Sequence, residues 1–102
     1  MIHVIATIEL HPGKRAAFLQ EFYQVMPYVH SETGCFEYGP TIDVQTSIPA
    51  QGAAREDVVT VVEKWADLPA LELHLQAPHM LEYRTKVKDY VKSVKLHVLQ
   101  AA

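Results

Sequence analysis

Cysteine is almost absent from this chain of 102 residues, because Cys35 is the only one. A single cysteine cannot form an internal disulfide, so nothing in the sequence indicates a secreted, disulfide-stabilised domain. Cys35 also has no partner in a Cys-x-x-Cys pair, and its place beside Gly34 favours a small buried residue over a nucleophile.

Glycine and runs of basic residues are scarce as well. Only four glycines occur and none forms a phosphate-binding loop, so the familiar nucleotide and flavin motifs are missing. The formal net charge is −3, and no basic run is longer than Lys14-Arg15, which argues against nucleic acid as a partner. Residues 1–9 have no basic stretch and carry polar residues every few positions, unlike a signal peptide or a membrane span. We therefore expect a cytoplasmic protein without a membrane partner.

Hydrophobic residues make up 49% of the chain and charged residues 21%, which is typical of a globular protein. The length predicts a single domain over residues 1–102. Period-two hydrophobic patterns predict strands and period-3.6 patterns predict helices. The expected strands are 2–10, 35–45, 57–65 and 93–100; the expected helices are 14–32, 68–76 and 78–91; a surface loop is expected at 46–56.

This order, β-α-β-β-α-α-β, predicts an α+β fold, a ferredoxin-like split βαβ sandwich with an antiparallel four-stranded sheet. Pro40 places strand 35–45 at a sheet edge or makes it bulged, and simple alternation puts Phe36 and Tyr38 on one face. Strands 2–10 and 57–65 are apolar on both faces, although helices can cover only one. A second copy of the chain is the simplest cover for the other face, which predicts a homodimer closed by sheet-to-sheet packing.

Unusual polar residues cluster at the end of strand 57–65. Glu63 lies on a strand face shared with valines, so it is either functional or held in an ion pair, with Arg84 or Lys86 as candidate partners. Trp65 on the same face is either a core anchor or a flat wall for an aromatic ligand with its indole N–H as a donor.

Two histidines follow. His74 lies beside the inward stripe of its helix, as a core or interface residue or as a general base. His79 is at a helix start, where the positive end of the helix dipole favours a neutral imidazole that can accept a proton. Their spacing of five residues, with Pro78 between them, does not fit a zinc site, and no metal is expected.

Three segments carry a family resemblance: residues 31–38 (SETGCFEY), 62–65 (VEKW) and 70–80 (ALELHLQAPHM). They resemble the antibiotic biosynthesis monooxygenase family, and in particular its bacterial quinol monooxygenase branch. The likeness extends over essentially the whole chain, and the third segment is its most specific part.

The resemblance implies a dimeric α+β barrel with one pocket per subunit between helices and sheet. It also implies oxidation of a quinol or a related polycyclic phenol by molecular oxygen, without a metal or flavin cofactor. His74 is then the expected base and Trp65 the ring wall and donor. The expected substrate-binding residues are Tyr38, Glu63, His79, Tyr23, Met80 and Arg84.

Other activities of similar proteins fit less well. Haem-degrading relatives use an asparagine, a tryptophan and a histidine at places that fall near Ala6, His74 and Arg84, so haem degradation is not expected. An isomerase of a small phosphorylated sugar would need a phosphate grip, which Arg84 and Lys86 could supply. A non-catalytic protein that binds quinones or other aromatic molecules is the remaining alternative.

Overall fold

The computed structural model describes the whole chain, residues 1–102. Four strands and three helices follow one another in the predicted order, and none of the helices is both long and apolar enough to cross a bilayer. The elements are β1 (Ile2–Leu10), α1 (Arg15–His30), β2 (Cys35–Thr41), β3 (Val58–Trp65), α2 (Leu68–Gln76), α3 (Pro78–Val87) and β4 (Val91–Leu99).

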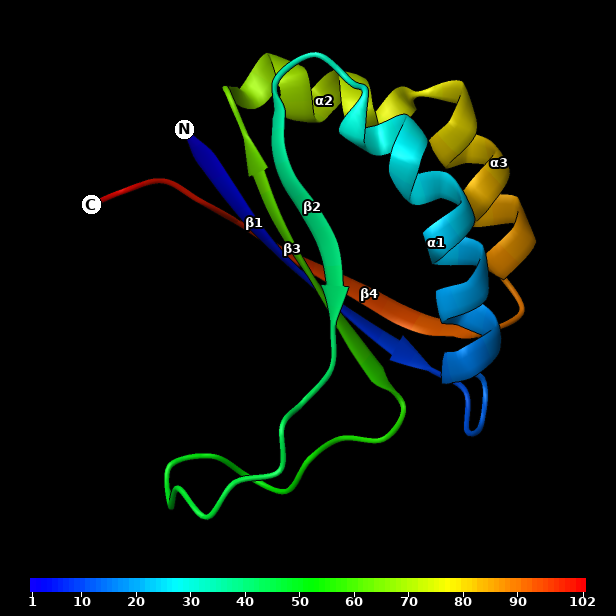
Figure 1. Cartoon of the computed structure of the whole chain (residues 1–102), viewed down its shortest axis with the longest axis vertical. Helices are drawn as coiled ribbons and strands as arrows, with labels where there is room; N and C mark the ends of the chain where they lie inside the picture. The colour runs from blue at the N-terminus through cyan, green and yellow to red at the C-terminus, as the bar shows by residue number, and fades with distance from the viewer.

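The strands form one antiparallel sheet in the order β2-β3-β1-β4, and the three helices gather on one side of it (Figure 1). This confirms the predicted α+β, ferredoxin-like fold. The two central strands are β3 and β1, as in a split βαβ fold, and each has a neighbouring strand on both sides.

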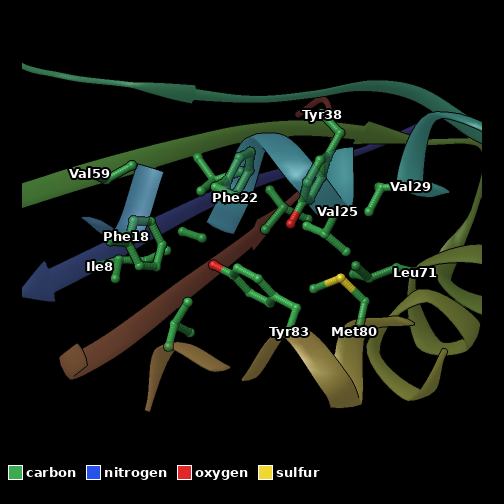
Figure 2. Packing of buried hydrophobic residues seen from close by; sticks show 14 of the residues in the cluster. Ile8, Phe18, Phe22, Val25, Val29, Tyr38, Val59, Leu71, Met80 and Tyr83 are labelled. Atoms are coloured by element: carbon green, nitrogen blue, oxygen red, sulfur yellow. The ribbon is translucent and has the colours of Figure 1, made fainter. Parts of the chain in front are cut away.

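The register of the sheet decides which side chains meet the helices. Ala6 of β1 pairs with Val61 of β3 and with Leu96 of β4, so these three residues share the helix-facing side. Helix α1 packs against this side of the sheet with its buried stripe, which includes Phe18 and Phe22. Figure 2 shows this layer, in which the ring of Phe22 stacks on Tyr38 at 5.2 Å with an interplanar angle of 7°.

The opposite face of the sheet has no cover within the chain. Its central positions are Ile5 and Thr7 of β1 and Thr60 and Val62 of β3, and all four are half-buried. This is the face for which the sequence predicts a second subunit.

Two expected boundaries were wrong. The third helix ends at Val87 rather than near residue 91, and Val91, the last residue of the expected helix, begins β4. Val91 pairs with Leu10 of β1, and Tyr90 closes the preceding turn by donating its backbone N–H to Val87 at 2.8 Å. Pairing with β1 therefore makes Val91 part of the sheet instead of the helix.

Strand β2 is shorter than expected and lies at the edge of the sheet, one of the two alternatives that Pro40 predicted; it is also bulged, but at its start and not at Pro40. The register shifts between Cys35 and Glu37, so the expectation that Phe36 and Tyr38 lie on the same face of the strand was wrong. A bulge inserts one extra residue and turns the following side chains. Phe36 is consequently 64% exposed, whereas Tyr38 points into the core.

The segment between β2 and β3, residues 42–57, extends away from the rest of the molecule (Figure 1). Its base is closed by Asp43, whose carboxylate accepts hydrogen bonds from the Arg55 guanidinium at 2.8 and 2.9 Å. Ile48 at its outer part is exposed.

Candidate functional site

A cavity of about 680 Å³ lies between the helices and the helix-facing side of the sheet. Seventeen residues line it and thirteen of them are hydrophobic; the other four are Glu63, His74, Arg84 and Lys88. Cavities of this size and composition are typical of small-molecule sites, in which a few polar groups orient an otherwise apolar ligand. On β4, the lining residues Val94 and Leu96 remain exposed, so the cavity opens on this side.

Glu63 is the carboxyl group of the cavity. It is only 5% exposed, and its Oε1 accepts a hydrogen bond from the indole N–H of Trp65 at 2.9 Å. Burial raises the pKa of Glu63 to about 7, the negative charge of Glu32 adds to this, and the Trp65 hydrogen bond opposes it. The group can therefore hold or release a proton close to neutral pH.

Neither candidate ion-pair partner of Glu63 pairs with it, because both are engaged elsewhere. Arg84 donates from Nη2 to the carbonyl oxygen of Leu75 at 2.7 Å, and Lys86 lies 3.5 Å from Glu82 on its own helix. Of the two alternatives for this residue, the cavity carboxyl remains.

Trp65 lies behind the cavity rather than on its wall. The residue is fully buried, it does not line the cavity, and its N–H is already used by Glu63. Its ring centroid is 4.5 Å from that of His74. In this arrangement Trp65 contacts both Glu63 and His74, and its ring is not part of the cavity wall as expected.

His74 reaches the cavity from α2 and is 2% exposed. Its Nδ1 is 2.9 Å from Oε2 of Glu32, in the turn between α1 and β2. Burial lowers the pKa of His74, while the hydrogen bond and negative charge of Glu32 act in the opposite direction. Every fully buried side-chain nitrogen or oxygen atom of the protein has a hydrogen-bond partner. Nε2 of His74 has none, so it is not fully buried, and because His74 lines the cavity this nitrogen is open to it.

Comparison with known proteins places this site in a family. The family model described as "Antibiotic biosynthesis monooxygenase" matches residues 1–86. The chain belongs to the antibiotic biosynthesis monooxygenase family. An Escherichia coli K12 protein named "Probable quinol monooxygenase YgiN" is 37% identical over 102 residues, which cover 98% of this chain and 97% of that protein. Membership of this monooxygenase family supports an oxygenase-type enzyme.

Solved structures agree on the antibiotic biosynthesis monooxygenase fold. PA3566 from Pseudomonas aeruginosa superposes with a TM-score of 0.80 at 26% identity, covering 99% of this chain and 93% of that one. A putative antibiotic biosynthesis monooxygenase from Deinococcus radiodurans gives a TM-score of 0.81 at 19% identity over 100% and 93% of the two chains. At that identity the second likeness concerns the fold alone.

Within this family fold, three of the other expected substrate-binding residues line the cavity: Tyr38, Met80 and Arg84. Tyr83 of α3 joins them, and the hydroxyls of Tyr38 and Tyr83 point into the space between helix and sheet (Figure 2). Tyr23 does not belong to the site, because it projects from the exposed side of α1.

His79 lies outside the cavity. Its ring stacks on Tyr28 of α1 at 5.9 Å and lines a separate groove of about 480 Å³ between α1 and α3, as does Lys86. Through Nε2 it contacts the same Glu32 oxygen that His74 contacts, at 2.8 Å. His79 is thus connected to the cavity through Glu32 without touching it.

Sequence reasoning missed Glu32, although the residue lies in one of the segments that carry the family resemblance. The signal available was Gly34, which has a φ of +84° and whose missing Cβ would lie 2.8 Å from Cβ of Ala70. Only glycine permits this close, left-handed turn against the start of α2. The turn brings the Glu32 side chain onto the helix that carries His74.

The arrangement can hold a flat apolar molecule between aromatic and aliphatic walls, with two proton-accepting groups beside it. Glu63 and His74 are those groups, and they are linked by Trp65. No group of three or more histidine, cysteine, aspartate or glutamate side chains is arranged to hold a metal ion.

Proposed function

We propose that the chain is a cofactor-independent monooxygenase that oxidises a quinol or a related polycyclic phenol with molecular oxygen. The observation that carries the proposal is the cavity, where a largely apolar wall encloses His74 and Glu63. Family membership and the 37% identity to a probable quinol monooxygenase support it.

The protein's task in such a reaction is limited to binding and proton transfer. Nε2 of neutral His74 accepts the proton of a phenolic hydroxyl, which leaves an electron-rich phenolate. The phenolate passes one electron to oxygen, and the resulting superoxide and phenoxyl radical join at a ring carbon. His74 returns its proton to the peroxide oxygen, and loss of water from the resulting hydroperoxide leaves a hydroxylated quinone, so one oxygen atom enters the ring and the other leaves as water.

The walls of the cavity support this chemistry by holding the ring and excluding bulk water. Phe18, Phe22 and Met80 supply apolar contacts, and the Tyr38 and Tyr83 hydroxyls are donors for the second oxygen of a quinol. Burial raises the pKa of Tyr38 and of Tyr83 far above their ordinary values, so both hydroxyls keep their protons at neutral pH.

The proposal includes a homodimer, because the half-buried face of the sheet around Ile5 and Val62 has no cover within the chain. Sedimentation or scattering should give twice the mass of one chain. A monomer at micromolar concentration would contradict this part alone, since the cavity is on the other face of the sheet.

Oxygen uptake with a reduced naphthoquinone tests the activity. We expect a rate above autoxidation that a chelator leaves unchanged, and that His74→Ala lowers by about 100-fold or more, the usual contribution of a general base. Trp65→Phe should also lower it, because Glu63 and His74 lose their support. His11→Ala is the matched control, since His11 is exposed in the turn after β1.

If the purified protein leaves the rate unchanged across a panel of quinols and anthrones, the monooxygenase proposal is rejected. Quenching of Trp65 fluorescence by the same compounds without product would then indicate a protein that binds aromatic molecules and does not transform them.

One observation favours a second candidate. Arg84 and Lys88 are cationic groups in the lining of the cavity, and they could hold the phosphate of a small sugar in an isomerase. Lys86, expected in this role, lies in the other groove. A rise in melting temperature with sugar phosphates but not with quinones would favour the isomerase.

A further inference from the structure

Glu32 is a partly buried carboxylate that contacts both candidate histidines. Its side chain is 14% exposed, and its Oε2 lies 2.9 Å from Nδ1 of His74 and 2.8 Å from Nε2 of His79. The three side chains come from three elements: the turn after α1, helix α2 and helix α3. Such convergence on one oxygen is not required by packing, since each histidine could have been an apolar residue.

The contact with Glu32 decides which nitrogen of His74 faces the cavity as an acceptor. A neutral imidazole has one N–H and one lone pair. With Nδ1 against a carboxylate, the N–H must be there, so the lone pair is on Nε2, which is open to the cavity. The reverse tautomer would present an N–H to the substrate and could not accept its proton.

The same carboxylate stabilises the product of proton transfer. When His74 accepts a proton, a positive charge forms on a residue that is 2% exposed, and burial opposes this strongly. The negative charge of Glu32 offsets that cost, as a buried carboxylate does for the histidine of hydrolase triads.

His79 competes for this oxygen from the solvent side. Its side chain is 25% exposed in the groove between α1 and α3, so its ring is in contact with the solution there. A protonated His79 places a positive charge beside Oε2 of Glu32 and so weakens the electrostatic stabilisation that Glu32 gives to a proton on His74. Groups that face His74 from all packed elements are Glu32 from the turn, Tyr38 of β2, Trp65 of β3 with its bound Glu63, and Arg84 and His79 of α3.

We infer that Glu32 is a positioning residue of the proposed reaction, which fixes the tautomer of His74 through one oxygen that His79 shares and modulates. The reaction itself rests on the proposed function; the coupling of the three side chains does not. His79 thereby links the basicity of a residue inside the cavity to the solution in the groove outside.

NMR of the full chain labelled with ¹⁵N-histidine tests the coupling without turnover. We expect His74 in the Nδ1–H tautomer at pH 7.5. Glu32→Gln should lower its titration midpoint by about one pH unit or more, the usual effect of losing a close opposite charge. His79→Asn keeps a donor for Glu32 but removes the positive charge, so it should raise that midpoint. Glu37→Gln is the matched control: it removes one carboxylate on the next strand, paired only with Lys64, and should change neither.

Kinetics give the second measurement. Glu32→Gln should lower kcat by about 10- to 100-fold while KM changes by less than about threefold, because the substrate does not touch Glu32. The acid limb of the kcat/KM profile should move to lower pH in Glu32→Gln and to higher pH in His79→Asn.

Opposite outcomes separate the two proposals. If the wild type oxidises a quinol but Glu32→Gln leaves the tautomer, the midpoint and kcat unchanged, the coupling is overturned and the activity stands. If no substrate is oxidised but the midpoints move in the two expected directions, the activity fails and the coupling stands. Should Glu32→Gln not fold, a midpoint that does not rise in His79→Asn overturns the inference.

Discussion

The region around Glu63 and the region around Glu32 place the same side chain in similarly enclosed surroundings. Glu63 faces the cavity and has one neutral donor, the indole of Trp65. Glu32 lies behind the cavity and has two imidazole partners on a single oxygen. Both side chains are thus mostly enclosed, Glu63 more fully than Glu32, and their partners differ.

This difference indicates separate tasks. A carboxyl with a single neutral partner in a low-dielectric site retains its proton up to a higher pH, as the pKa of Glu63 at about 7 reflects, with burial as its main cause. A carboxylate with two imidazoles orients them and compensates their charge. The exposed fraction alone would not have distinguished these roles.

The largest expected effect comes from removing the turn that places Glu32. Gly34→Ala introduces a Cβ 2.8 Å from that of Ala70 at a φ of +84°, so the turn must move. We expect the free energy of unfolding to fall by about 2 to 5 kcal/mol, from backbone strain and overpacking together. Urea denaturation measures it.

Gly13→Ala is the control for backbone strain alone. Gly13 has a φ of +78° but no atom within 4 Å of its added Cβ. It should cost only about 1 to 2 kcal/mol. Equal losses in the two variants would show that the approach of the turn to α2 contributes nothing.

A smaller effect, of opposite sign, is expected at Glu63. Its folded pKa of about 7 lies above the ordinary value of 4.5, so the folded state binds more protons between these pH values. Stability from this group is therefore complete below pH 4.5 and is lost as the pH rises to 7. Glu63→Gln has no such loss and should be more stable than the wild type at pH 8 by up to about 3 kcal/mol, with little difference at pH 4.5.

Denaturation of the wild type and of Glu63→Gln at a series of pH values checks this. His74 acts in the opposite sense, because its lowered pKa makes stability fall as the pH drops below 6.5, but it does so equally in the wild type and in Glu63→Gln. A difference between these two proteins that is flat with pH would contradict the buried-acid interpretation.

The smallest effect is expected at Asp43, in the segment between β2 and β3. Hydrogen bonds from Arg55 lower the pKa of Asp43 to about 2, a large shift, yet the Arg55 side chain is 54% exposed, so solvent screens the pair. Surface ion pairs contribute little to stability. The melting temperature of Asp43→Asn should match that of the wild type within experimental error, and a clear decrease would mean that this segment is packed against a partner.

Most of the fold could be predicted from the sequence because hydrophobic periods of 2 and 3.6 are local signals. The errors arose where pairing between distant strands decides. Val91 fits the helical stripe, but Leu10 of β1 recruits it into the sheet. The bulge after Cys35 is also set by register against β3 and has no signature in its own residues.

The candidate site was predicted only in part, because some of its signals are local and others depend on residues far apart in the sequence. Glu63 and His74 were found because a carboxyl and an imidazole on otherwise apolar faces stand out locally. Glu32 could not be found this way, since its partners are 42 and 47 residues away in the sequence. Trp65 was assigned to the ligand because the use of its N–H by a neighbour two residues away depends on a side-chain rotamer.

The close approach of Gly34 to Ala70 also has a consequence for local unfolding. The backbone N–H of Ala66 donates to the carbonyl oxygen of Gly34 at 2.8 Å, so the turn is fastened to the start of the β3–α2 connection. Detaching it would withdraw Glu32 from both histidines at once. We therefore expect the three side chains to open as one cooperative unit, and protection of the Ala66 amide against exchange should report whether Glu32 contacts both histidines.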